Sequence, residues 1–139
     1  MEKTFSITEI ETVAEWFWEH CGNFNVIAFY GEMGVGKTTL IHQLCKIKGV
    51  EDAVSSPTFS LINSYQMPSG SKLYHIDLYR IRDEEEAREA GMEDALYSGD
   101  LCLVEWPEKA LGIFPETRVE VHLTLNADYT RHIKLSLKS

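Results

Sequence analysis

Residues 26–38 read Val26-Ile27-Ala28-Phe29-Tyr30-Gly31-Glu32-Met33-Gly34-Val35-Gly36-Lys37-Thr38. An apolar run of strand character ends at Gly31, and the residues from there to Thr38 match the phosphate-binding pattern G-x-x-x-x-G-K-[S/T]. The following residues, 39–45, place apolar side chains at helical spacing. Strand, glycine-rich loop and helix in this order predict an α/β P-loop fold that binds a nucleoside triphosphate. The alternative is a glycine turn that matches the pattern by chance.

The chemistry of this loop is expected to lie mainly in its backbone. Its glycines let successive N–H groups point at phosphate oxygens, because no β-carbon blocks the approach. We expect Lys37 to reach the β- and γ-phosphates, and the Thr38 hydroxyl to ligate Mg²⁺ at the start of a helix whose dipole favours negative charge. The residues of this segment predicted to contact the nucleotide are Glu32, Met33, Gly34, Val35, Gly36, Lys37, Thr38 and Thr39.

Length and composition predict one globular domain over residues 1–139. The chain is 44% hydrophobic and 25% charged, enough for a core of its own. No uncharged apolar segment approaches the roughly twenty residues that span a membrane, and the chain opens without a secretory segment, so we expect a cytoplasmic protein without a membrane anchor. Thirteen basic residues against 22 acidic ones give a net charge of −9. A protein that grips DNA or RNA by itself needs the opposite balance.

The cysteines and histidines show no metal-site spacing. Cys21, Cys45 and Cys102 are odd in number, widely spaced and embedded in apolar surroundings, so we expect buried, reduced thiols. The histidines also fall singly along the chain and are interpreted as structural. They are His20, His42, His75, His122 and His132.

Hydrophobic periodicity and turn residues predict the other elements. The first helix has two capping-box spacings, Ser6 with Glu9 and Thr8 with Glu11. The expected elements are a helix from residues 7–9 to 21, an antiparallel hairpin of strands 59–66 and 72–77, an acidic helix from 83 to about 99, a buried strand of the parallel kind over 101–104, and a hairpin of alternating strands 119–125 and 133–137.

Two carboxylates end apolar, strand-like runs. Asp77 follows residues 73–76, and Glu105 follows residues 101–104. Ligands of open α/β sheets collect at the carboxyl ends of strands, and nucleotide hydrolysis requires a carboxylate in the metal shell. We favour Glu105 as the Mg²⁺ carboxylate, with a share in activating water, and Asp77 as its companion. The alternative for each is an ordinary strand-end carboxylate.

Two further features are candidates for the site. Thr58 lies between the P-loop helix and the next strand, where many P-loop proteins carry a switch segment whose hydroxyl meets the metal or the γ-phosphate. The alternative is a loop that enters a strand. Arg80 and Arg82 follow Asp77, and arginine suits developing phosphoryl charge. Surface pairing with the acidic run 83–86 is an equally good reading of Arg82.

Five segments in this order resemble one family. They are Gly31 to Thr38, Ser56-Pro57-Thr58-Phe59, His75-Ile76-Asp77-Leu78-Tyr79-Arg80, Glu89-Ala90-Gly91 and Glu105-Trp106-Pro107-Glu108. Together they look like the TsaE (YjeE) family, the small bacterial ATPase component of tRNA threonylcarbamoyladenosine biosynthesis. The resemblance spans nearly the whole chain, and its Asp-Leu-Tyr-Arg and Glu-Trp-Pro elements are far more specific than the P-loop.

The resemblance implies a P-loop fold whose central sheet is mostly parallel and flanked by helices, with antiparallel hairpin additions. It implies ATP and Mg²⁺ as ligands and the TsaB and TsaD proteins as partners, with tRNA reached only through the complex. By this resemblance the catalytic residues are Lys37, Asp77, Glu105 and Thr58, the metal ligands are Thr38, Glu105 and Asp77, Trp106 supports Glu105, and the adenine contacts come from Ser6 to Thr8 and from Arg131.

Other readings of the P-loop make different predictions. A signalling GTPase would carry an Asn-Lys-x-Asp guanine reader, which the sequence lacks. A small-molecule kinase would carry an arginine-rich lid, whereas the five arginines are scattered. A nucleotide-sensing adaptor would bind ATP without hydrolysing it. The sequence contains no visible acyl-transfer constellation, so we expect ATP hydrolysis to reset the complex, with the acyl transfer carried out elsewhere.

Overall fold

The computed structural model describes residues 1–50 and 61–138. Within them, no helix is both long and apolar enough to cross a bilayer. The elements in chain order are β1 (Glu2–Phe5), the 3₁₀ turn η1 (Ile7–Glu9), α1 (Ile10–His20), β2 (Val26–Tyr30), α2 (Lys37–Ile47), β3 (Ile62–Gln66), β4 (Lys72–Asp77), α3 (Glu84–Glu89), α4 (Met92–Leu96), β5 (Leu101–Glu105), the 3₁₀ turns η2 (Pro107–Lys109) and η3 (Leu111–Ile113), β6 (Arg118–Leu125) and β7 (Arg131–Lys138).

The described strands form one sheet of seven in the order β1-β7-β6-β2-β5-β4-β3. The centre is parallel, because β2 pairs with β5 and β6, and β4 pairs with β5. The margins are antiparallel, since β3 pairs with β4, β6 with β7, and β1 with β7. The predicted parallel centre with antiparallel hairpin additions is therefore confirmed, and the seven-stranded sheet as a whole is mixed. The two predicted hairpins and an unforeseen edge strand, β1, contribute as many antiparallel pairs as there are parallel ones.

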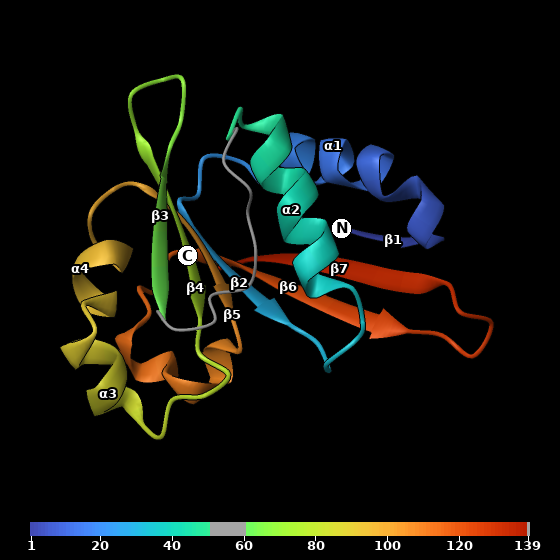
Figure 1. The fold of residues 1–139 in the computed structure, drawn as a ribbon. Helices are drawn as coiled ribbons and strands as arrows, with labels where there is room; N and C mark the ends of the chain where they lie inside the picture. The colour runs from blue at the N-terminus through green and yellow to red at the C-terminus, as the bar shows by residue number, and fades with distance from the viewer. Residues whose placement is uncertain (51–60, 139) are drawn as a thin grey trace.

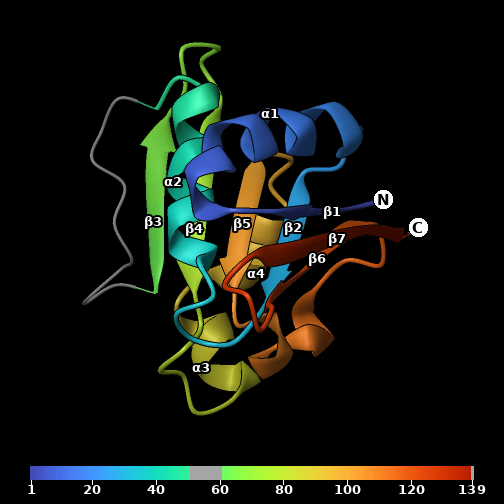
Figure 2. The same ribbon diagram turned by 90° about the vertical axis from the view of Figure 1, so that its right-hand side faces the viewer.

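The sheet is covered by helices on both faces, as Figures 1 and 2 show. Helices α1 and α2 lie over one face, where Val13, Phe17, Leu40 and Leu44 enter a core cluster with alternate residues of the central strands. The other alternate residues of β2, β4 and β5 pack against α3, α4 and the 3₁₀ turns. Strands buried on both faces read as continuous apolar runs, which explains the pattern of β2 and β5.

The hairpin predictions are confirmed where residues are described. Strand β3 runs over 62–66, while residues 59 and 60 of the predicted strand lie outside the described residues. The second hairpin closes with Asn126 N–H donating to Thr130 O at 2.8 Å.

Two helix predictions need correction. The acidic helix is broken at Gly91, whose φ of +95° ends α3 and begins α4. Helix α1 begins at Ile10, after η1, and its capping residue is Glu9, so the spacing of Thr8 with Glu11 is not used as a cap. The other capping box forms on η1, where Ser6 N–H donates to Glu9 Oε1 at 2.8 Å.

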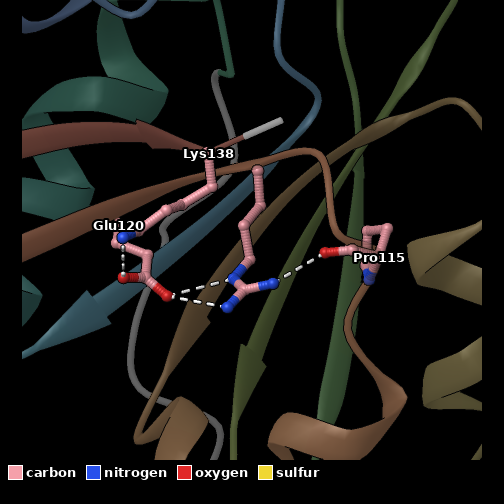
Figure 3. Close-up of polar contacts among 4 residues, drawn as sticks. Pro115, Glu120 and Lys138 are labelled. Atoms are coloured by element: carbon pink, nitrogen blue, oxygen red, sulfur yellow. Dashed lines mark hydrogen bonds and ion pairs between the residues drawn. The ribbon is translucent and has the colours of Figure 1, made fainter.

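A polar cluster fixes the start of β6 on the face that does not enter the α1–α2 core (Figure 3). Arg118 donates from Nη2 and Nε to Glu120 Oε2 at 2.9 and 3.1 Å, and from Nη1 to Pro115 O at 2.9 Å. Lys138 Nζ on β7 lies 3.9 Å from Glu120 Oε1. These contacts join β6 to the loop before it and to the end of β7.

Candidate functional site

The loop between β2 and α2 adopts a backbone conformation that depends on glycine. Gly34 and Gly36 have φ angles of +84° and +105°, which strain any residue that carries a β-carbon. Gly36 immediately precedes α2, and its carbonyl accepts a hydrogen bond from Leu40 N–H at 3.0 Å. The N–H groups of the first helical turn have no intrahelical partner, so the loop and the helix end together favour an anion.

Lys37 begins α2 and points into the protein. Its side chain is buried, and its Nζ has no hydrogen-bond acceptor among the described residues. Nζ lies 3.7 Å from the centroid of the Trp106 ring. Burial lowers the pKa of Lys37, while the negative charges of Glu105, Glu108 and Asp77 oppose that shift. A buried ammonium without an acceptor costs free energy, and a phosphate oxygen is the kind of acceptor that would satisfy it.

Glu105 is the last residue of β5 and is 3% exposed. Its Oε1 accepts a hydrogen bond from Thr38 Oγ1 at 3.5 Å, the long end of the range. Its Oε2 accepts one from His75 Nε2 at 2.7 Å. The predicted metal carboxylate therefore lies beside the hydroxyl that starts the P-loop helix, although the two residues are far apart in the sequence.

Asp77 is the last residue of β4 and the register partner of Glu105 across the parallel pair. Its Oδ1 accepts a hydrogen bond from Tyr79 N–H at 3.0 Å. Burial raises the pKa of Asp77, the bond from Tyr79 lowers it, and the charge of Glu105 raises it further. The structure thus brings together the two carboxylates that the sequence analysis singled out.

Both carboxylates face the P-loop helix. Leu73 and Leu103 belong to the core cluster under α1 and α2, and alternate residues of a strand share a face. Asp77 and Glu105 follow these leucines by four and two positions, so they lie on the same side of the sheet as Lys37 and Thr38.

His75 is a site residue that the sequence interpretation missed. Its isolated position in the sequence predicts a structural role, but it is fully buried and its nearest polar partner is Glu105. A usable signal was present: a polar residue inside an apolar strand, two positions before Asp77 and therefore on the same face. The scattered spacing of the five histidines hid it, because spacing in sequence says little about neighbours across a sheet.

Trp106 follows Glu105 directly and has a φ of +59°, a left-handed conformation that is uncommon outside glycine. Its ring packs on the Tyr79 ring at a centroid distance of 5.2 Å, as well as on Lys37. The indole therefore contacts Lys37 and Tyr79, and its expected support of Glu105 stays a prediction.

The amino-terminal segment and the last hairpin meet at the P-loop. A β-carbon built on Gly36 would have Ile7 Cδ1 at 3.8 Å and Arg131 Nε at 4.0 Å as its nearest neighbours. Arg131 Nε also donates to Val35 O at 3.4 Å. Ser6 immediately precedes Ile7, so the residues predicted for adenine contact converge near the loop, and their contact with a base stays a prediction.

The remaining predicted residues are less informative. Thr58 lies outside the described residues. Glu32, Met33 and Thr39 are exposed around the loop. Arg80 is exposed, and Arg82 pairs with Glu86 through Nε and Oε2 at 2.9 Å, which confirms the surface-pairing reading of Arg82. The cysteine prediction is also confirmed, because all three are buried and free.

The donors at this site suit magnesium better than a transition metal. Among the described residues there is no group of three or more His, Cys, Asp and Glu side chains that could hold a metal ion. The available donors are the hydroxyl of Thr38 and the carboxylates of Glu105 and Asp77, which are all oxygens. Mg²⁺ takes one or two protein carboxylates and completes its shell with substrate phosphates and waters. The residues therefore fit a Mg²⁺ ion that binds together with a phosphate ligand.

Comparison with protein families gives a match over most of the chain. The family described as "Threonylcarbamoyl adenosine biosynthesis protein TsaE" matches residues 4–133. This range includes the P-loop, both carboxylates and Arg131.

Individual relatives carry the same description, "tRNA threonylcarbamoyladenosine biosynthesis protein TsaE". The Haemophilus influenzae protein is 39% identical over 105 residues, which are 76% of this chain and 65% of that protein. The Rickettsia bellii protein is 40% identical over 108 residues, or 77% and 74% of the two chains. The Bacillus subtilis protein is 32% identical over 109 residues, or 78% and 67%. The matched region thus spans about two thirds to three quarters of each relative.

A solved structure shares the fold. The crystal structure of Bacillus subtilis YdiB superposes with a TM-score of 0.77 over 100% of this chain and 86% of that one, at 22% sequence identity. The mixed sheet and its flanking helices are therefore an architecture already seen in a solved structure. The family match over residues 4–133 and the relatives at 30 to 40% identity show that this chain belongs to the TsaE family of threonylcarbamoyladenosine biosynthesis proteins.

Proposed function

We propose that this protein is a P-loop ATPase of a single domain, which binds and hydrolyses ATP with Mg²⁺ in the biosynthesis of threonylcarbamoyladenosine on tRNA. The observation that supports this most is Lys37, whose buried ammonium has no hydrogen-bond acceptor among the described residues. It lies at the start of a helix, next to Glu105 and Asp77, where a triphosphate would supply the missing acceptors.

Each residue of the site has a role in this proposal. The N–H groups of residues 32–39 hold the phosphates, and Lys37 neutralises the β- and γ-phosphates. Thr38 Oγ1 and Glu105 Oε1 hold Mg²⁺, with Asp77 at its margin. Bound Mg²⁺ supplies a positive charge for the developing phosphoryl oxygens. Glu105 also orients the attacking water.

The proposed partners are the TsaB and TsaD proteins, with tRNA contacted only through the complex. A net charge of −9 disfavours direct binding of tRNA by this component. In this scheme ATP hydrolysis resets the complex between turnovers and the acyl transfer takes place on a partner. The cytoplasmic location expected from the sequence stays a prediction.

Two other functions remain distinct hypotheses. A small-molecule kinase would need arginines free to close over the phosphates, yet Arg82, Arg88 and Arg118 are paired with Glu86, Glu93 and Glu120. A nucleotide-sensing adaptor would use the same P-loop without hydrolysis. A carboxylate beside Thr38 favours hydrolysis over sensing, because it can orient the attacking water as well as hold Mg²⁺.

The test is phosphate release by wild type, Lys37→Ala and Glu105→Ala, each with and without the two partner proteins. We expect Lys37→Ala to abolish binding of ATP, and Glu105→Ala to bind ATP while losing about 100-fold or more in rate. Calorimetry with ATP, GTP and ADP gives the base preference. Arg88→Ala, on α3 and paired with Glu93 at the surface, serves as the control.

The outcomes separate the hypotheses. Binding of ATP without phosphate release under any condition would identify a sensor, and release that depends on a small acceptor would identify a kinase. Repeated turnover of the reconstituted modification reaction by Glu105→Ala would contradict the proposed coupling role.

A further inference from the structure

His75 and Glu105 form a buried pair whose geometry the proposed roles leave unexplained. His75 is completely buried in the middle of β4, and Glu105 is 3% exposed at the end of β5. The Nε2 to Oε2 distance is 2.7 Å, which is short for a hydrogen bond from nitrogen to oxygen. A carboxylate only accepts hydrogen bonds, so His75 carries a hydrogen on Nε2 and donates it.

This bond sets the orientation of the carboxylate. With Oε2 held by His75, Oε1 is the oxygen that lies 3.5 Å from Thr38 Oγ1 at the start of α2. The terminal torsion of a glutamate side chain is broad, so by itself it does not fix the direction of the carboxylate oxygens. A single donor on one oxygen therefore decides which lone pairs of the other oxygen face the P-loop.

A purely structural role accounts poorly for this histidine. Leu73, on the same face of β4, and Ile76, on the opposite face, are fully buried apolar residues. His75 Nδ1 has no hydrogen-bond partner among the described residues, so the core gains less from this side chain than from an apolar one of the same size. The imidazole therefore leaves one nitrogen unsatisfied while the other holds Glu105.

We propose that His75 is a positioning residue for Glu105, whose Nε2–H holds the carboxylate with Oε1 directed at Thr38 and at the Mg²⁺ that binds with ATP. This inference rests on the proposed ATPase function. It deepens that function by naming the residue that orients the metal carboxylate. Histidine and carboxylate pairs around metal ligands tune the affinity of the metal in the same way.

The test compares two substitutions at the same position, His75. In His75→Gln the side-chain amide nitrogen replaces Nε2 as a donor, whereas His75→Leu removes the donor and keeps an apolar volume. His20→Leu is the control, because His20 lies on α1 and its hydrogen bond among the described residues is with the Trp16 carbonyl. All three are assayed for ATPase kinetics with the partner proteins, and for Mg²⁺ binding by calorimetry in the presence of a non-hydrolysable ATP analogue.

We expect His75→Leu to lose about 10- to 100-fold in kcat and in Mg²⁺ affinity, while the binding of ATP and of ADP without metal stays within about threefold. His75→Gln should recover most of both losses, and His20→Leu should match wild type. Wild-type values in both His75 variants would overturn the proposal. The proposal would also be overturned if both variants lost kcat and Mg²⁺ affinity equally and in step with a loss of thermal stability, because that pattern indicates a packing role.

A spectroscopic measurement on the nucleotide-free protein covers the case in which His75→Leu does not fold. The Nε2–H proton of His75 should give a hydrogen-bonded signal in nitrogen-15 nuclear magnetic resonance of wild type, and the signal should shift or exchange away in Glu105→Ala. An unchanged signal would contradict the bond and the proposal with it. If wild type itself neither binds nor hydrolyses ATP with Mg²⁺, the proposed function fails. An unchanged signal, or wild-type values in both His75 variants, would contradict the role of His75 and leave the proposed function intact.

Discussion

Lys37 and Trp106 contact each other across the site, with the ammonium 3.7 Å from the centroid of the indole. The ring belongs to the residue after Glu105, and its backbone is left-handed at φ +59°. A buried ammonium with no hydrogen-bond acceptor among the described residues thus rests on the electron-rich face of an aromatic ring. The ring offsets part of the cost of keeping that charge buried before a phosphate arrives.

The first prediction is that this contact stabilises the nucleotide-free protein. Trp106→Leu removes the aromatic face, and Lys37→Met removes the charge, so the two changes should not be additive. We expect a coupling free energy of about 0.5–2 kcal/mol, the range for a partly desolvated cation–π contact. Urea unfolding of wild type, both single variants and the double variant measures it.

Trp106→Phe is the control for this cycle, because it keeps an aromatic face of smaller area. It should retain most of the coupling. Additive effects of Trp106→Leu and Lys37→Met, within about 0.3 kcal/mol, would show that the contact contributes nothing.

The second prediction concerns pH and the cysteines. Burial raises the pKa of Cys21 to about 11 and those of Cys45 and Cys102 to about 12, from an ordinary value of 9.0. The unfolded chain therefore releases these protons at lower pH than the folded protein. The stability linked to the thiols is fully present below pH 9.0 and is lost as the pH rises through the folded values.

Thiol labelling and unfolding measure this linkage. At pH 8 the native thiols should react with a disulfide reagent far more slowly than in denaturant, because folding keeps them protonated and buried. Between pH 9 and 11, the unfolding free energy of a variant with all three cysteines changed to alanine should fall less steeply than that of wild type. Rapid labelling of any cysteine in the native protein at pH 8 would contradict the burial.

The site was largely predictable because its chemistry is local in sequence. The P-loop is one continuous segment, and Asp77 and Glu105 each end an apolar run, so strand-end reasoning identified both without knowledge of their pairing. Their adjacency follows from β4 and β5 being neighbours in the sheet, which the resemblance implied only in general terms. His75 escaped because its importance lies in one contact with a residue thirty positions away.

The fold was less predictable where short elements depend on tertiary partners. Strand β1 is four residues long and alternates weakly, and its place is fixed by pairing with β7 at the other end of the chain. The acidic segment has a helical composition on both sides of Gly91, and a single glycine does not decide whether a helix continues through it. The φ of +95° at Gly91 is what shows the break. The balance of parallel and antiparallel pairs likewise depends on which strands become neighbours, and periodicity does not encode that.

The third prediction tests two glycines with left-handed backbones. Gly91, between α3 and α4, has a φ of +95° and open space where a β-carbon would lie. Gly49 has a φ of +82°, and its β-carbon would lie 2.7 Å from Pro68 Cγ. Gly91→Ala should cost about 1 kcal/mol from backbone strain alone. Gly49→Ala should cost more, because the clash adds to the same strain.

Thermal and urea unfolding of the two variants measure the difference. Gly91→Asn is the control, since asparagine tolerates the left-handed region better than alanine. Equal costs for Gly49→Ala and Gly91→Ala would mean that the loop at Pro68 moves freely out of the way.

The fourth prediction separates binding from hydrolysis through Arg131. Its guanidinium donates from Nε to Val35 O at 3.4 Å and from Nη1 to Tyr129 O at 3.0 Å, so it links the last hairpin to the P-loop backbone. Among the described residues, the hydrogen bonds of Arg131 go to the P-loop backbone and to its own hairpin. Arg131→Met should therefore weaken ATP and ADP binding by a similar factor, about 3- to 30-fold, with little change in kcat, because the groups that act on the γ-phosphate stay in place.

Lys134→Met is the matched control. Lys134 is exposed on the same strand, so this change removes a positive charge away from the loop. Calorimetry with both nucleotides and steady-state phosphate release with the partner proteins give the two quantities. A fall in kcat at unchanged KM would contradict a binding role, since it would place the effect of Arg131 in the reaction step. Loss of ATP binding with ADP binding intact would instead place the effect of Arg131 at the γ-phosphate. That result would contradict the predicted contact of Arg131 with the adenine.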